Sequence, residues 1–83
     1  KTKQGQVYYE TKIHWNGDLL VGRYENEIEA AIAYNKAAST LLRKGYLKDY
    51  PVNYIEELSD SEYRSRYQVV DISDKIKVLK SLL

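Results

Sequence analysis

The dipeptide Asn16-Gly17 most constrains how this chain folds, because it separates two runs rich in β-branched and aromatic residues, 7–15 and 18–24. Asn and Gly both tolerate the positive φ angles of a tight hairpin turn. This pair is among the strongest short-range hairpin signals when such runs flank it. The sequence therefore predicts an antiparallel hairpin over about residues 7–24.

Alternation along each strand assigns the side chains of this hairpin to two faces, because successive residues point to opposite sides. The apolar face comprises Tyr9, Thr11, Ile13, Trp15, Leu19, Val21 and Tyr24. The more polar face comprises Tyr8, Glu10, Lys12, His14, Asp18, Leu20 and Gly22. A two-stranded ribbon is marginally stable alone, so we expect another element to cover its apolar face.

A long helix is predicted directly after the hairpin. Asn26 is a suitable N-cap and Glu29 follows three residues later, as in a capping box. Apolar residues, many of them alanines, then recur at helical spacing, and Gly45 is a suitable C-terminal stop. We expect a helix over about residues 27–44, and its small side chains would let it lie close across the sheet.

The C-terminal part of the chain predicts one or two further helices. Ser59 and Glu62 form a second capping-box pattern, at the start of a short helix that ends near Tyr67. Residues 67–72 fit either a short strand or an extended link. A last helix follows, capped by Ser73 or Asp74 and carrying one apolar stripe of Ile76, Leu79, Leu82 and Leu83.

These elements predict an α+β fold, a small antiparallel sheet packed on one long helix with C-terminal helices added. Eighty-three residues, 43% hydrophobic and 30% charged, suit one globular domain with a thin core. The chain has no cysteine, and His14 is its one histidine, so we expect no metal site. We also expect neither a cofactor nor an enzyme, because no phosphate loop or nucleophile–base set occurs. No apolar run approaches the roughly 20 residues that cross a bilayer.

Several segments together resemble the Apetala-2/ethylene-responsive-factor DNA-binding family. They are residues 9–13 (YETKI), Asn16-Gly17, residues 21–24 (VGRY) and residues 27–38 (EIEAAIAYNKAA), with residues 47–51 similar to the family's exit from its helix. The resemblance covers about residues 7–51. It implies a three-stranded antiparallel sheet on one helix, with the outer face of the sheet reading double-stranded DNA in the major groove.

The family's first strand has no counterpart here, because residues 1–5 (KTKQG) look like the loop that follows it. Two alternatives stay open: the DNA-binding domain, residues 1–53, is truncated at its N-terminus, or residues 67–72 supply a third strand. Residues 54–83 would then form a helical extension that packs on this domain.

The resemblance places DNA-facing positions at Lys12, His14, Asp18 and Leu20, with Glu10 nearby, on the same polar face that alternation predicts. Lys12 would donate to a base edge or a phosphate, and His14 would do the same. Asp18 and Leu20 stand where relatives usually have arginine and tryptophan. Candidate phosphate contacts outside this set are Lys1, Lys3 and Arg23.

Two functions stay open at this point. The first is a DNA-binding domain of a transcription regulator or mobile-element protein, located in the nucleus of a eukaryote or the cytoplasm of a bacterium. The second is a protein-interaction module on the same scaffold, which dimerises or docks a partner through Leu20 and the C-terminal stripe. A net charge of only +1 favours the second function.

Overall fold

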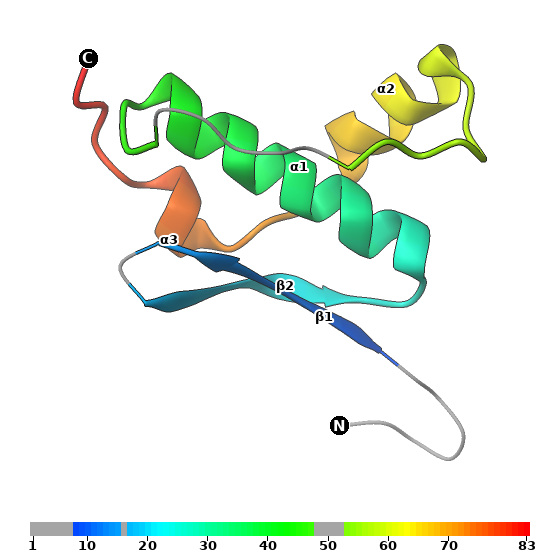
Figure 1. Cartoon of the computed structure of the whole chain (residues 1–83), viewed down its shortest axis with the longest axis horizontal. Coiled ribbons are helices and arrows are strands. Elements are labelled where there is room, and N and C mark those ends of the chain that lie inside the picture. The colour runs from blue at the N-terminus through cyan, green and yellow to red at the C-terminus, as the bar shows by residue number, and fades with distance from the viewer. Residues whose placement is uncertain (1–7, 16, 48–52) are drawn as a thin grey trace.

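The computed structural model describes residues 8–15, 17–47 and 53–83 of the chain. It is an α+β structure in which a two-stranded antiparallel sheet packs on one long helix, as predicted. Figure 1 shows this helix, α1, lying across the hairpin, with α2 and α3 at opposite ends of α1. The elements are β1 (Tyr9–His14), β2 (Asp18–Tyr24), α1 (Glu27–Arg43), α2 (Asp60–Val69) and α3 (Asp74–Lys77).

The predicted hairpin is confirmed, and Gly17 adopts the positive φ of 93° that its turn requires. Asn16 lies outside the described residues. The pairing contains a β-bulge that the sequence did not reveal. Thr11 pairs with Gly22 whereas Lys12 pairs with Leu20, so Val21 is an extra residue in β2.

The bulge resets which side chains of β2 face inward. Val21 and Tyr24 are both buried although they are three residues apart. Gly22 pairs with buried Thr11, and a Cβ atom at Gly22 would point into the ring of Tyr24. The prediction that Gly22 faces outward is therefore wrong, because simple alternation does not continue through a bulge.

Helix α1 forms as its capping residues predict. The side-chain oxygen of Asn26 accepts a hydrogen bond of 2.8 Å from the Glu29 N–H, and Gly45 has a φ of 91° just beyond the C-cap residue, Lys44. The stripe that α1 turns to the sheet is fully buried and rich in alanine: Ile32, Ala33, Ala37, Ala38 and Leu41. Short alanine side chains bring the helix axis close to the sheet.

The C-terminal segment completes the same core, because Val70, Ile72 and Ile76 belong to one buried cluster with Ile13 and Val21 of the sheet. Helix α2 begins with the predicted capping box of Ser59 and Glu62. It continues two residues beyond Tyr67, and residues 70–73 then run as an extended link. Of the two alternatives open for residues 67–72, the extended link forms over 70–73 and the third strand does not: in the described part of the chain the sheet has two strands.

The last helix is also shorter than predicted. Helix α3 ends at Lys77 after a single turn, so the expected apolar stripe does not form on one helix face. Ile76 is fully buried and Leu79 is half-buried, whereas Leu82 and Leu83 are exposed. The backbone N–H of Leu82 instead donates to the Lys44 carbonyl at 2.6 Å, which fixes the tail against the end of α1.

Lys36 of α1 and Lys44, the C-cap residue of α1, hold the helices that follow. The Lys36 ammonium donates to the carbonyls of Tyr67 and Val70 at 2.9 and 2.8 Å, at the end of α2. The Lys44 ammonium donates to the carbonyls of Lys77 and Leu79 at 2.7 and 2.6 Å, at the end of α3. Helix C-termini leave unpaired carbonyls with partial negative charge, so each ammonium satisfies them and complements the helix dipole.

Tyr24 joins β2 to the extended link. Its ring is buried, and its hydroxyl donates to the Asp71 carbonyl at 2.5 Å. Burial, with smaller contributions from the negative charges of Asp71 and Glu29, raises the pKa of Tyr24 to about 12.

This raised pKa predicts a loss of stability at alkaline pH. Between pH 10 and 12 the unfolded chain releases the Tyr24 proton while the folded protein keeps it, so unfolding becomes more favourable by up to about 2 kcal/mol. Urea unfolding of Tyr24→Phe across this range is expected to lack that loss, because the two proteins differ in this one hydroxyl. Parallel pH profiles for the two proteins would contradict this assignment.

Candidate nucleic-acid interface

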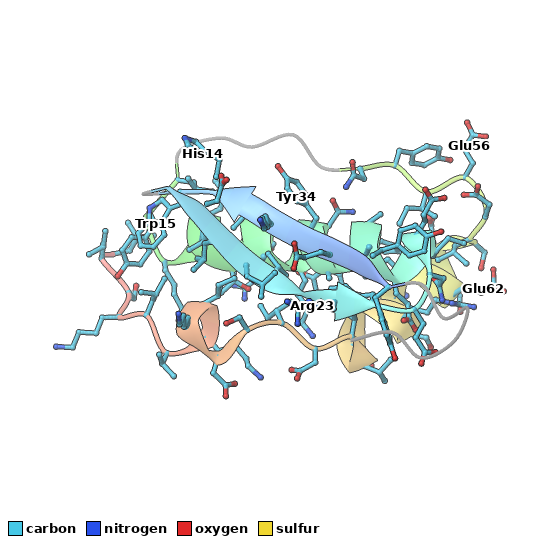
Figure 2. The ribbon with its side chains drawn as sticks, turned by 90° about the horizontal axis from the view of Figure 1, so that it is seen from below. His14, Trp15, Arg23, Tyr34, Glu56 and Glu62 are labelled. Carbon is cyan, nitrogen blue, oxygen red and sulfur yellow. The ribbon has the colours of Figure 1, made fainter. Side chains whose placement is uncertain are left out.

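The outer face of the hairpin collects six of the eight residues predicted to contact DNA. Figure 2 looks onto this face, with His14 at one end of β1 and Arg23 towards the opposite end of β2. The cross-strand pairs along it are Glu10 with Arg23, Lys12 with Leu20, and His14 with Asp18. All six residues are exposed. Lys1 and Lys3 lie outside the described residues.

Arg23 reaches this face because of the bulge. Without the extra residue in β2, alternation from buried Val21 would give Arg23 the same inward direction. The bulge turns it outward, directly opposite Glu10, and turns Tyr24 inward. The sequence placed Arg23 among the candidate phosphate contacts without a position in the sheet, and the register supplies that position.

Glu10 links the two permanent cations of the face. Its carboxylate lies 3.2 Å from Nε of Arg23 and 3.6 Å from Nζ of Lys12. All three side chains remain substantially exposed, at 40% for Glu10, 53% for Lys12 and 63% for Arg23. Ion pairs this exposed contribute only about 0–1 kcal/mol, so both cations can exchange Glu10 for a competing anion.

The other end of the face carries a weaker pair. Nδ1 of His14 lies 3.5 Å from the Asp18 carboxylate, and both side chains are largely exposed. With a neutral histidine, the cations Lys12 and Arg23 balance the anions Glu10 and Asp18. The face is therefore polar and rich in donors but carries no net positive charge, unlike a strongly basic nucleic-acid surface.

Leu20 lies in the middle of this polar face, opposite Lys12, and is 37% exposed. The C-terminal tail therefore does not bury it. A partly exposed leucine beside hydrogen-bond donors provides the kind of apolar contact that a thymine methyl group accepts. The same side chain would also suit a protein partner.

Among the described residues there is neither a metal-binding cluster nor a membrane-spanning helix. They contain no cluster of three or more His, Asp or Glu side chains that could hold a metal ion. None of the helices formed by these residues has the length and apolar character needed to cross a bilayer. A hollow on α2 is lined by Tyr63 and Tyr67 together with Asp60, Arg64 and Gln68, and none of these residues is among the predicted site residues.

No family model matches this chain, and neither curated proteins nor solved structures give a match. The resemblance to the Apetala-2/ethylene-responsive-factor family therefore stays a prediction from the sequence segments that carry it.

Proposed function

We propose that this protein binds double-stranded DNA, with the outer face of the β1–β2 hairpin in the major groove, as part of a transcription regulator or a mobile-element protein. One observation carries the proposal: Lys12, His14 and Arg23 are spread along the same exposed face of a two-stranded ribbon whose other face is fixed to a helix. The major groove is wide enough to admit such a ribbon. The proposal requires an intracellular location.

The residues of the face take different roles in this proposal. Lys12, near its centre, would donate to guanine acceptors or to a phosphate. Arg23 and His14, at opposite ends, would donate to phosphates on either side of the groove and set the register of the protein. Asp18 would accept from a cytosine amino group, and Leu20 would contact a thymine methyl.

Removing either cation is expected to weaken DNA binding. Lys12→Ala and Arg23→Ala should each lower the affinity for mixed duplex DNA by about 5–10-fold at low salt. Each should also reduce the slope of log K against log salt by about 1. Lys80→Ala, an exposed lysine of the C-terminal tail, is the control that removes the same charge elsewhere. Fluorescence anisotropy at several salt concentrations would measure both quantities.

An equal loss in the Lys80→Ala control would mean that binding follows net charge alone, against a specific role for this face. Absence of wild-type binding even at low salt would exclude the proposal for this chain.

Neutralising Glu10 is expected to have the opposite effect. Glu10→Gln removes a negative charge from the face and releases Lys12 and Arg23, so the affinity for duplex DNA should rise by about 3–10-fold. Glu56→Gln is the matched control, because Glu56 is exposed and lies far from the hairpin face in Figure 2. Weaker binding by Glu10→Gln would contradict this prediction and would mean that the charged carboxylate itself contributes to binding.

A second candidate function, a protein-interaction module, is favoured by the balanced charge of the face and by Leu20 at its centre. The two candidates differ in their partner and in the salt dependence of binding. Duplex DNA should shift the resonances of Lys12 and His14, and binding should weaken steeply with salt, whereas a protein partner that docks on Leu20 should bind without DNA and without steep salt dependence.

A further inference from the structure

The two edges of the hairpin are protected to different degrees. Residues 70–73 run beside the outer edge of β2, where the Ser73 N–H donates to the Val21 carbonyl at 2.9 Å. The outer edge of β1 pairs with no strand among the residues that the structure describes. An open strand edge presents N–H and C=O groups that can pair with another strand, and β1 carries no proline to prevent this.

The surface beside this edge is hollow. A depression of about 390 Å³ follows β1 and the flank of α1, lined by Glu10, Thr11, Lys12, Ala30, Ala31, Tyr34 and Asn53. The alanines of α1 are short, so the helix leaves space above a strand placed next to β1. The local shape therefore suits an additional strand at this edge.

We propose that the occupant of this edge is β1 of a second copy of the chain, paired antiparallel with Thr11 at the two-fold axis. In this register Glu10 of each copy faces Lys12 of the other, and Tyr9 faces Ile13. Paired residues of an antiparallel sheet lie on the same face, so opposite charges meet on the outer face. The two Thr11 side chains lie opposite each other on the inner face, where each hydroxyl keeps its hydrogen bond to the Ala30 carbonyl of its own chain at 3.3 Å.

The neighbouring symmetric registers lack this complementarity. A two-fold axis at Lys12 would place the two lysines opposite each other, and an axis at Glu10 would do the same for the two carboxylates. Like charges directly opposite are destabilising. Charge therefore selects the register centred on Thr11, and a self-complementary patch of this kind is what a symmetric dimer requires.

The resulting dimer has one four-stranded antiparallel sheet. The outer faces of the two hairpins form a continuous surface, and both copies of α1 lie on the opposite side. The inference rests on the edge of β1 and does not depend on DNA binding, so either proposal can fail without the other.

Charge reversal at the two facing positions tests the pairing. Wild-type protein should dimerise with a dissociation constant on the order of 0.1 mM, as expected for a small interface. Glu10→Lys and Lys12→Glu should each weaken dimerisation by about 10-fold or more, because both symmetric pairs become like-charged. Sedimentation equilibrium over a range of concentrations measures this, and far-UV circular dichroism checks that each variant is folded.

A one-to-one mixture of the two variants is the decisive sample. In the mixed dimer the two lysines of one chain face the two glutamates of the other, so the mixture should recover an affinity within about 3-fold of the wild type. The Glu10→Lys chain lacks its Glu10–Arg23 ion pair both alone and in the mixture. A recovered affinity would therefore come from the pairing between the two chains and not from this ion pair. A wild type that stays monomeric at millimolar concentration, or a mixture that does not recover, would overturn the proposal.

Discussion

Asn35→Ala is expected to lower the free energy of unfolding by about 2–3 kcal/mol, a large effect for the loss of one uncharged polar side chain. Asn35 is only 3% exposed on α1, and its amide makes three hydrogen bonds. Its oxygen accepts from the Asn53 N–H at 2.7 Å. Its nitrogen donates to the Asn53 carbonyl at 2.9 Å and to the Tyr63 hydroxyl at 3.1 Å.

The size of this effect follows from what the amide connects. One side chain pairs with both backbone groups of Asn53, as a neighbouring strand would, and also holds α2 through Tyr63. Alanine at position 35 removes all three bonds and leaves a small cavity beside α1. Urea unfolding monitored by circular dichroism would measure the loss.

Tyr63→Phe is the matched control, because it removes only one of the three bonds and should cost about 1 kcal/mol or less. At low pH, the stability loss caused by Asn35→Asp should lie between the losses caused by Tyr63→Phe and Asn35→Ala. At neutral pH the loss should be larger, because a carboxylate would face the Asn53 carbonyl. If Asn35→Ala costs no more than Tyr63→Phe, the pairing with Asn53 contributes nothing to stability.

The parts of the fold that were predictable have signals within a few residues of the chain. The hairpin follows from Asn16-Gly17, the bounds of α1 follow from Asn26 and Gly45, and the start of α2 follows from the Ser59 capping box. Each of these features depends on local turn or cap geometry, so the sequence alone reveals it.

The wrong predictions concern features that depend on distant residues. The apolar stripe from Ile76 onward predicted a long last helix. Helix α3 ends at Lys77, where the Lys44 ammonium binds the final carbonyls and the Leu82 N–H bonds to the Lys44 backbone. The choice between a third strand and an extended link at residues 67–72 also depends on distant residues, since residues 67–69 continue α2 and Lys36 binds the Tyr67 and Val70 carbonyls that end it.

The candidate interface was predictable only in part. Alternation correctly assigned Glu10, Lys12 and His14 to one exposed face, because β1 is regular. The position of Arg23 depends on the register of β2 against β1, which no short segment of the sequence specifies. The same is true of the Glu10 ion pairs, which reduce the charge available on the face.

The bulge that places Arg23 depends on Gly22, which leads to a second strong prediction. Gly22→Ala is expected to lower the free energy of unfolding by about 1–3 kcal/mol, the range seen when a packed site is overfilled. A Cβ atom at position 22 would overlap the Tyr24 hydroxyl and lie 2.8 Å from the ring carbon that carries it. The ring cannot move aside freely, because it is buried and its hydroxyl is bonded to the Asp71 carbonyl.

A double-mutant cycle separates this overlap from other costs of the substitution. Gly22→Ala should cost much less in a Tyr24→Ala background, where the ring is absent, so the two effects should be non-additive by about 1 kcal/mol or more. Gly17→Ala, in the turn of the same hairpin, is the control. Alanine at position 17 is strained by the positive φ, but its Cβ atom would overlap no side chain. The stability cost of Gly17→Ala should therefore be the same with and without the Tyr24 ring. Additive effects of Gly22→Ala and Tyr24→Ala would show that the ring does not limit position 22. Non-additive effects would show that the buried Tyr24 ring is what restricts position 22 to glycine, beside the bulge that turns Arg23 outward.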